Sequence, residues 1–332
     1  MTSPSDFSGR SRPRRLTALV AMCVLGFGLS AATAWAAFAT PTTSAGNEYR
    51  AAPDWVAPSA ARSVVEKSQG GIPGYIRPGG GYRVLAQVTD SGNPSSGITS
   101  VIADGGEGPQ ALSSGTIFTV GGLDYNYRSA LVTTSAVPEG VYPYTLASTD
   151  GVGNSRLQSG FSATVDNTAA SATGVQAANK AGGILGRPEI GDTATLTFND
   201  TIDPISVISG WNGALTDVVV RIDNNVAAQG GFDAMTIYNA SNSAALPLGT
   251  VRLARTDYVT ANSTFGVTGT TSKLTLSGGV ATVQLGTAAG TPTTAAGTGS
   301  MTWFPASAAY DRAGNPTSTT STTETGTVDV EF

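Results

Sequence analysis

The chain has 332 residues and a formal net charge of −5, and only 12% of its residues are charged. It contains no histidine, and its single cysteine, Cys23, lies in an N-terminal apolar stretch, so histidine-based triads, histidine metal sites and intramolecular disulfides are excluded. The 42 glycines and 17 prolines, together with abundant threonine and serine, favour short strands joined by tight turns. The composition therefore predicts an all-β protein.

The first 36 residues have the pattern of a signal peptide. Four arginines between residues 10 and 15 precede an apolar stretch from Leu16 to Ala32, and the small residues of ATAWA follow. We expect cleavage after Ala36, with Ala39 as a second option. A retained anchor stays open, because Leu16–Ala39 is long enough to span a bilayer. In both cases we expect an exported protein, secreted or at the cell surface, that meets the membrane only through this segment.

The next part of the chain predicts a linker and then a first domain. Residues 37–62 are rich in proline and alanine and lack sustained alternation, so we expect a linker or an edge segment there. From residue 63 to residue 167 the sequence alternates between apolar and polar positions. The expected strands are 82–90, 98–104, 116–120, 125–134, 138–150 and 159–167, and alternation places Tyr82, Val84, Ala86 and Val88 on one face of the first of them. Roughly seven short strands at this spacing favour an immunoglobulin-like (Ig-like) antiparallel β-sandwich.

Residues 168–332 repeat this plan at greater length and predict a second, larger Ig-like β-sandwich. The expected strands are 193–200, 216–224, 234–240, 250–259, 272–276, 280–286, 300–306 and 325–332. In the last of these, Val328, Val330 and Phe332 alternate with polar residues. We therefore expect TGTVDVEF to be the closing strand, with one face buried.

The phrase Asp-x-x-Gly-Asn occurs twice, in TDGVGN (149–154) and in YDRAGN (310–315), and Thr-Val-Asp follows each time. Asp and Asn bond to their own backbone, and Gly adopts a positive φ without steric cost. Both stretches therefore predict a hairpin turn before the last strand of a domain. Neither has the spaced carboxylates of an EF-hand loop, so we expect no calcium at Asp150 or Asp311 and no cofactor elsewhere.

The stretch EGVYPYTLASTDGVGN, followed by FSATVDN, resembles the end of bacterial Ig-like domains of secreted and cell-surface proteins, and the resemblance covers residues 80–167. In the second half, GDTATLTFNDTIDP and WFPASAAYDRAGNP are similar to Ig-like modules of surface-layer and adhesin-type proteins. The stretch TAWAAFATPTTSAGNEY is similar to camelysin-like, fibre-forming matrix proteins, with Ala39 where those have Ser or Thr. The resemblance implies a non-catalytic protein with a structural or adhesive role.

Residues for catalysis are few. No set of side chains supplies an acid, a base and an orienting group, so we do not expect an enzyme. A hydrolase stays open only through two carboxylate pairs, Asp200 with Asp203 and Asp217 with Asp223.

Trp211, in the loop sequence SGWNGA, is the one candidate ligand-binding residue, because an exposed indole stacks on sugar rings. It leaves an alternative function, that of an extracellular carbohydrate-binding or enzyme-accessory module. We assign the tyrosines of the first domain to core and strand-surface packing. The expected partners are cell-wall or extracellular polysaccharide, or other surface proteins. Nucleic acid is not expected, because only three lysines follow the leader and they form no basic run.

Overall fold

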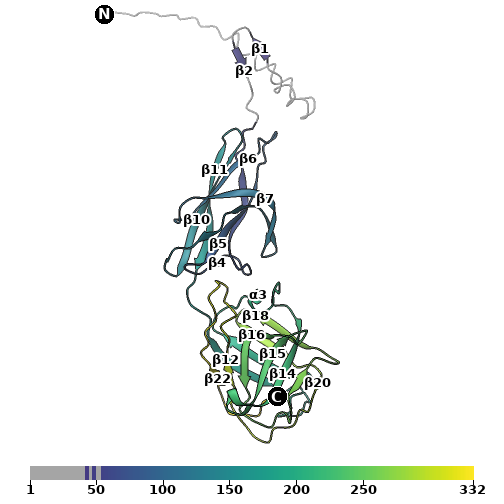
Figure 1. Cartoon of the computed structure of the whole chain (residues 1–332). Coiled ribbons are helices and arrows are strands. Elements are labelled where there is room, and N and C mark those ends of the chain that lie inside the picture. The colour runs from purple at the N-terminus through teal and green to yellow at the C-terminus, as the bar shows by residue number, and fades with distance from the viewer. Residues whose placement is uncertain (1–41, 45–46, 50–53) are drawn as a thin grey trace, which may run out of the picture. The chain divides into compact units, whose positions relative to one another are not determined.

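The computed structural model describes residues 42–44, 47–49 and 54–332. The expected signal peptide lies outside the described residues. Almost all regular structure in the described part of the chain is β-strand, and the only α-helix there is the single turn α3 (Pro204–Val207) (Figure 1). This confirms the all-β class that the composition predicts.

The chain divides into two compact units. One contains residues up to Val56 together with Gly92–Ser96, and within it β1 (Thr42–Ser44) pairs antiparallel with β2 (Asn47–Tyr49). The other contains Ala57–Ser91 and all residues from Gly97 onward. Its strands form two separate sets, which we call the first and the second strand set.

The first strand set contains nine strands and covers the first domain expected from the sequence. Its strands follow the order β3-β5-β8-β7-β6-β10-β11-β4, with β9 paired to β5. Every pair in this set is antiparallel except β11 with β4. The strands are β3 (Ser59–Lys67), β4 (Tyr75–Ile76), β5 (Gly81–Thr89), β6 (Ile98–Asp104), β7 (Gln110–Val120), β8 (Leu123–Ser129), β9 (Val132–Thr133), β10 (Gly140–Asp150) and β11 (Ser155–Val165).

The long strand β7 joins the two layers of this set. Its first two residues pair with β6, and the residues from Leu112 onward pair with β8, so the strand leaves one sheet and enters the other. The main core lies between the layers, and a smaller, separate cluster contains Leu85, Val120 and Tyr125. The four alternating residues expected on one face of β5 all belong to the main core, and its members include Val65, Tyr82, Val84, Ala86, Val88, Val101, Tyr127, Tyr144, Leu146 and Val165.

Strand β3 lies at the edge of this set and begins at Ser59, inside the stretch 37–62 that the sequence favours as a linker or edge segment. The side chain of Gln158 covers part of this edge. Its Oε1 accepts the Ala60 N–H at 2.6 Å, and its Nε2 donates to the Ala60 carbonyl at 3.1 Å. These two bonds satisfy backbone groups that an open sheet edge leaves unpaired.

The second strand set follows the order β12-β13-β19-β18-β14-β15-β16-β21-β22, with β17 paired to β14 and β20 paired to β17. No strand spans residues 166–171, which include the expected domain boundary. The strands are β12 (Ala172–Ala178), β13 (Thr193–Phe198), β14 (Thr216–Val226), β15 (Phe232–Asn239), β16 (Ala245–Arg252), β17 (Ser263–Phe265), β18 (Ser272–Ser277), β19 (Val280–Gln284), β20 (Ala288–Ala289), β21 (Thr302–Phe304) and β22 (Thr322–Thr323).

Trp303 on β21 is fully buried in the core of this set. Its ring packs edge-on against Phe198, with ring centres 4.7 Å apart, and its indole N–H donates to the Leu248 carbonyl at 2.6 Å. The ring is therefore buried without leaving its polar atom unpaired.

The expected closing strand at residues 325–332 is wrong. The last strand, β22, ends at Thr323, and the rest of the segment forms only an isolated bridge between Asp329 and Gly299. Gly326 has φ of 113°, which turns the chain away from a strand path. The apolar residues of the segment differ: Phe332 is 1% exposed and packs edge-on against Tyr258, and Val330 packs partly buried against the core, whereas Val328 is 51% exposed. The segment caps the core as an irregular chain.

We predict that Trp303→Ala lowers the free energy of unfolding by about 3–5 kcal/mol, because it empties the centre of a packed core. Trp303→Phe should lower it less, although the Leu248 carbonyl then loses its donor. Urea denaturation measures both changes. Trp211→Ala is the control, because Trp211 is only partly buried at the margin of the same core. Equal losses for the two alanine variants would contradict the central role of Trp303.

Candidate functional site

The first Asp-x-x-Gly-Asn phrase forms the expected hairpin turn between β10 and β11. The Asp150 carboxylate accepts the backbone N–H groups of Val152 at 3.0 Å and Asn154 at 2.8 Å, and the Asn154 amide donates to its other oxygen at 2.6 Å. Gly153 has φ of 94°. One aspartate thus organises the whole turn, as the residue types predict.

The second phrase repeats this bonding. Asp311 is fully buried, and its Oδ1 accepts the N–H groups of Ala313, Gly314 and Asn315, each at 2.9 Å. The Asn315 amide donates to the other oxygen at 2.9 Å. The same sequence therefore encodes the same local structure twice.

The surroundings of the second turn differ from the expectation. Its neighbours Tyr310 and Pro316 form only an isolated bridge, so the expected hairpin between two closing strands is wrong here.

The turn lies instead where the two strand sets meet, because Asn315 Nδ2 also donates to the carbonyl of Asp166 at 3.0 Å. We call this meeting place the junction. On the side of the first strand set it comprises Lys67, Ile72, Tyr75 and Asp166, the residue directly after β11. On the side of the second it comprises Asp200, Asp203, Asp311, Arg312 and Asn315.

A buried ion pair forms the centre of the junction. Lys67 Nζ, at the end of β3, is 2.5 Å from Asp203 Oδ2, and the two side chains are 2% and 0% exposed. Lys67 Nζ also donates to the Ile72 carbonyl at 3.0 Å, and the Ile72 N–H donates to Asp203 at 2.9 Å. Burial lowers the pKa of Lys67, whereas Asp203 and Asp311 act to raise it. The pair therefore depends on close hydrogen bonding in place of water.

The turn beside this pair has room for Asp203 because residue 71 is glycine. Gly71 has φ of 85°, and a Cβ atom there would lie 2.1 Å from Asp203 Oδ2. Asp203 also caps helix α3, because its Oδ1 accepts the Ile205 N–H at 3.3 Å. One carboxylate thus fixes the end of β3, the following turn and the start of α3.

Three more carboxylates lie together at the junction. Asp166, Asp200 and Asp311 have oxygen atoms within 4.8 Å of one another, and burial raises the pKa of Asp311. Arg312 lies beside them, with Nε 3.7 Å from Asp166 and Nη2 3.5 Å from Asp200, and its guanidinium covers the Tyr75 ring at 4.5 Å. Arg312 and Lys67 therefore offset part of the negative charge with the protein's own cations.

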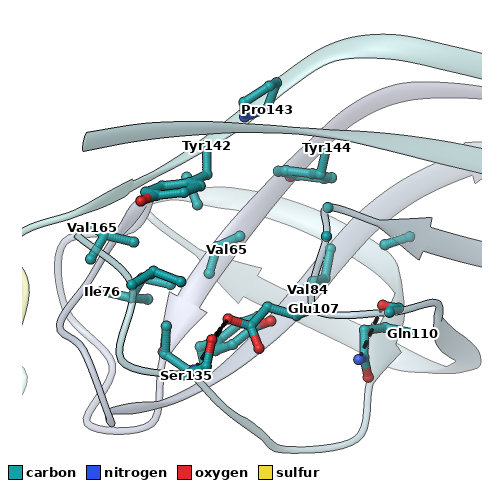
Figure 2. A pocket seen from close by; sticks show the side chains of 18 residues that line it. Val65, Ile76, Val84, Glu107, Gln110, Ser135, Tyr142, Pro143, Tyr144 and Val165 are labelled. Carbon is teal, nitrogen blue, oxygen red and sulfur yellow. Dashed lines mark hydrogen bonds between the residues drawn. The ribbon is translucent and has the colours of Figure 1, made fainter. Parts of the chain in front are cut away.

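A cavity of about 210 Å³ lies within the first strand set. Figure 2 shows Tyr142 and Tyr144 of β10 on one side of it and the Glu107–Ser135 contact on another. Glu107 accepts hydrogen bonds from the Ser135 hydroxyl at 2.5 Å and from its N–H at 3.1 Å. The cavity is smaller than the roughly 300–1,000 Å³ of most small-molecule sites. Among its lining residues Glu107 is the only carboxylate, and it is already engaged.

Trp211 lies just beyond α3, where its ring packs partly against the second core. Its indole N–H donates to the Ala214 carbonyl at 2.6 Å. The first-domain tyrosines are mainly core residues, as expected. Tyr82, Tyr125, Tyr127 and Tyr144 are buried, and Tyr75 and Tyr142 are half-buried. The structure therefore does not bring Trp211 together with a group of exposed tyrosines.

The two candidate carboxylate pairs have separate partners. Asp203 is buried against Lys67, whereas Asp200 contacts Arg312. Asp217 is exposed and lies 2.5 Å from Lys273 Nζ, which lowers its pKa. Three of the four carboxylates, Asp200, Asp203 and Asp217, thus lie against a cation, and neither pair is held together as an acid–base pair.

Comparison with family models and with curated proteins identifies no relative of the chain. No protein-family model matches the chain, and no curated protein is significantly similar to it. Within the part of the chain that the structure describes, no helix has the length and apolar character needed to cross a membrane.

The ion pair at the centre of the junction has no local sequence signal. Lys67 ends an ordinary strand, and its partner Asp203 lies 136 residues later in a turn. Asp166 and Asp311 both occur in stretches that the sequence does draw attention to, the repeated Thr-Val-Asp and the repeated Asp-x-x-Gly-Asn. That repeat and the candidate carboxylate pair Asp200 with Asp203 are the sequence signals that point toward the junction.

We predict that Lys67→Met lowers the free energy of unfolding of the full chain by about 3–5 kcal/mol, because it leaves Asp203 charged and buried. Asp203→Asn should also destabilise, and the double variant should lose clearly less than the sum of the two single losses. A double-mutant cycle from urea denaturation measures the coupling. Additive losses would show that the two side chains do not stabilise each other.

Gly71 and Gly74 offer a matched test of the turn. Both have a positive φ, but a Cβ at Gly74 would meet nothing within 4 Å. Gly74→Ala should therefore cost only the backbone strain of roughly 1–2 kcal/mol. Gly71→Ala should cost distinctly more, because its methyl group displaces Asp203. Melting temperatures of the two variants give the comparison, and equal shifts would remove the argument for close packing at residue 71.

Proposed function

We propose that the protein is an exported, non-catalytic protein of two Ig-like β-sandwiches with a structural or adhesive role. The observation that carries this proposal is the junction. Its buried Lys67–Asp203 pair and the Asn315–Asp166 hydrogen bond connect the two strand sets within one compact unit. A protein that transmits tension or presents a binding surface away from a cell needs such a stiff connection between its domains, whereas a free linker would let them swing.

Sequence features support the location. The pattern of residues 1–36 is that of a signal peptide, and the stretch ending in TDGVGN resembles bacterial Ig-like domains of secreted and cell-surface proteins. The partners that fit this role are cell-wall or extracellular polysaccharide and other surface proteins.

The chemistry of the described residues supports a role without catalysis. The cavity of the first strand set has one carboxylate, Glu107, which is hydrogen-bonded to Ser135. At the junction the carboxylates lie against Lys67 and Arg312. Neither place combines an accessible nucleophile with a base and an orienting group.

We predict that fractionation of the producing cells recovers the protein in the medium or on the cell surface, and that the purified chain shows no hydrolase activity on extracellular polysaccharides. Recovery in the cytoplasm would contradict the proposal. A pull-down with the same polysaccharides tests the carbohydrate-binding alternative, with Trp211→Ala as the probe variant. Specific binding that this variant loses would replace the structural role with a carbohydrate-binding one.

A further inference from the structure

The irregular C-terminal segment brings three carboxylates together away from the junction. Oxygen atoms of Glu324, Asp329 and Glu331 lie within 4.8 Å of one another. Backbone bonds hold the segment in place: the Glu324 N–H donates to the Met301 carbonyl at 2.9 Å, and the Asp329 carbonyl accepts the Gly299 N–H at 2.9 Å. The cluster is therefore built on a fixed backbone.

Glu331 has an unusual environment for an acidic residue. It is 1% exposed, and neither of its carboxylate oxygens has a hydrogen-bond partner. Oxygen Oε1 of Glu324 is likewise buried without a partner. Among the described residues, no lysine or arginine forms an ion pair with any of the three carboxylates. Buried carboxylates are normally paired, hydrogen-bonded or bound to a metal, and none of the residues that the structure describes supplies a cation to this cluster.

We propose that Glu324, Asp329 and Glu331 form a calcium-binding site. Each of the three carboxylates can supply a ligand atom, and Ca²⁺, which accepts six to eight oxygen ligands with mixed monodentate and bidentate geometry, can take further ligands from second carboxylate oxygens and from water at the exposed Asp329. Mg²⁺ fits less well, because it requires strict octahedral geometry and keeps several waters, whereas Glu331 is enclosed by protein.

The exposure of the three residues provides an entry path for the ion. Asp329 is exposed, Glu324 is half-buried and Glu331 is buried, so the carboxylates lead from the surface inward. The Met301 N–H donates to Glu324 Oε2 at 3.2 Å and orients that side chain, which leaves Oε1 for a ligand. The Glu331 N–H donates to the Tyr258 hydroxyl at 3.1 Å and holds the innermost ligand in place.

The comparison with the junction shows why the ion should bind here. The junction cluster of Asp166, Asp200 and Asp311 has Arg312 beside it, and Asp311 is saturated by backbone donors. Among the described residues, the C-terminal cluster has no arginine beside it, and its buried Glu331 carboxylate accepts no hydrogen bond.

The test uses the purified full chain after treatment with a chelator. Isothermal titration with CaCl₂ should show one binding site, and Ca²⁺ should raise the melting temperature, because the ion binds the folded chain. Glu331→Gln should abolish both effects. Asp329→Asn is a second variant at an exposed position, which should fold normally and weaken Ca²⁺ binding by an order of magnitude or more. Asp200→Asn, which alters the junction cluster instead, is the matched control and should bind Ca²⁺ like the unaltered chain.

Three results would overturn the proposal. If Ca²⁺ produced neither a binding heat nor a thermal shift, the cluster would be a pair of carboxylates, Glu331 and Glu324, that share a proton and bind no metal. Stabilisation of the chain by Glu331→Gln would support that interpretation. Loss of Ca²⁺ binding in Asp200→Asn with retention in Asp329→Asn would move the site to the junction. Equal thermal shifts with MgCl₂ and CaCl₂ would contradict the selectivity for calcium.

Discussion

The architecture of the larger unit depends on one ion pair that is withdrawn from water. An ammonium group and a carboxylate lose their hydration when they are buried, and the loss is recovered only if their geometry and hydrogen bonds are nearly complete. Lys67 and Asp203 meet this condition with the help of the Ile72 backbone, which both accepts from the lysine and donates to the aspartate. The ion pair and its hydrogen bonds therefore fix the positions of three parts of the chain: the end of β3, the Gly-containing turn after it and the residue before α3.

A polar junction has a different consequence from an apolar one. The hydrophobic effect has no preferred direction, whereas an ion pair with two backbone hydrogen bonds needs specific distances and angles and is satisfied in only one register. The Asn315 bond to the Asp166 carbonyl adds a second fixed point from another loop. Together the two contacts define how the strand sets join, which is the property that the proposed structural role requires.

Period-two alternation predicted the strands well where one face of a strand is buried and the other is solvated. The strand at 98–104 has the expected limits, and Tyr82 and Val84 lie on the buried face of β5 as expected. Alternation misled at the chain end because it assigns every acidic residue to solvent, whereas Glu331 is buried beside Phe332. In this segment Phe332 is buried but Val328 is exposed, and the backbone forms only the isolated bridge between Asp329 and Gly299, so the alternation of the sequence does not correspond to a strand.

The candidate sites were less visible in the sequence than the strands, for a physical reason. An ion pair such as Lys67–Asp203 and a cluster such as Glu324 with Glu331 are made by tertiary structure, and each member looks like an ordinary solvated residue in its own stretch. Trp211 shows the opposite case. Its loop setting attracts attention, yet the indole N–H is bonded to Ala214 within the same loop.

The two Asp-x-x-Gly-Asn turns differ in their susceptibility to asparagine deamidation. An asparagine deamidates when the backbone nitrogen of the next residue attacks its side-chain amide, and this requires a nitrogen that carries a hydrogen. Asn154 is followed by Ser155, which has one, whereas Asn315 is followed by Pro316, whose ring nitrogen has none. The turn that connects the two strand sets is thus shielded from a reaction that would replace an amide donor by a carboxylate beside Asp166 and Asp311. The identity of one neighbouring residue, Pro316, thus protects the amide that bonds across the junction.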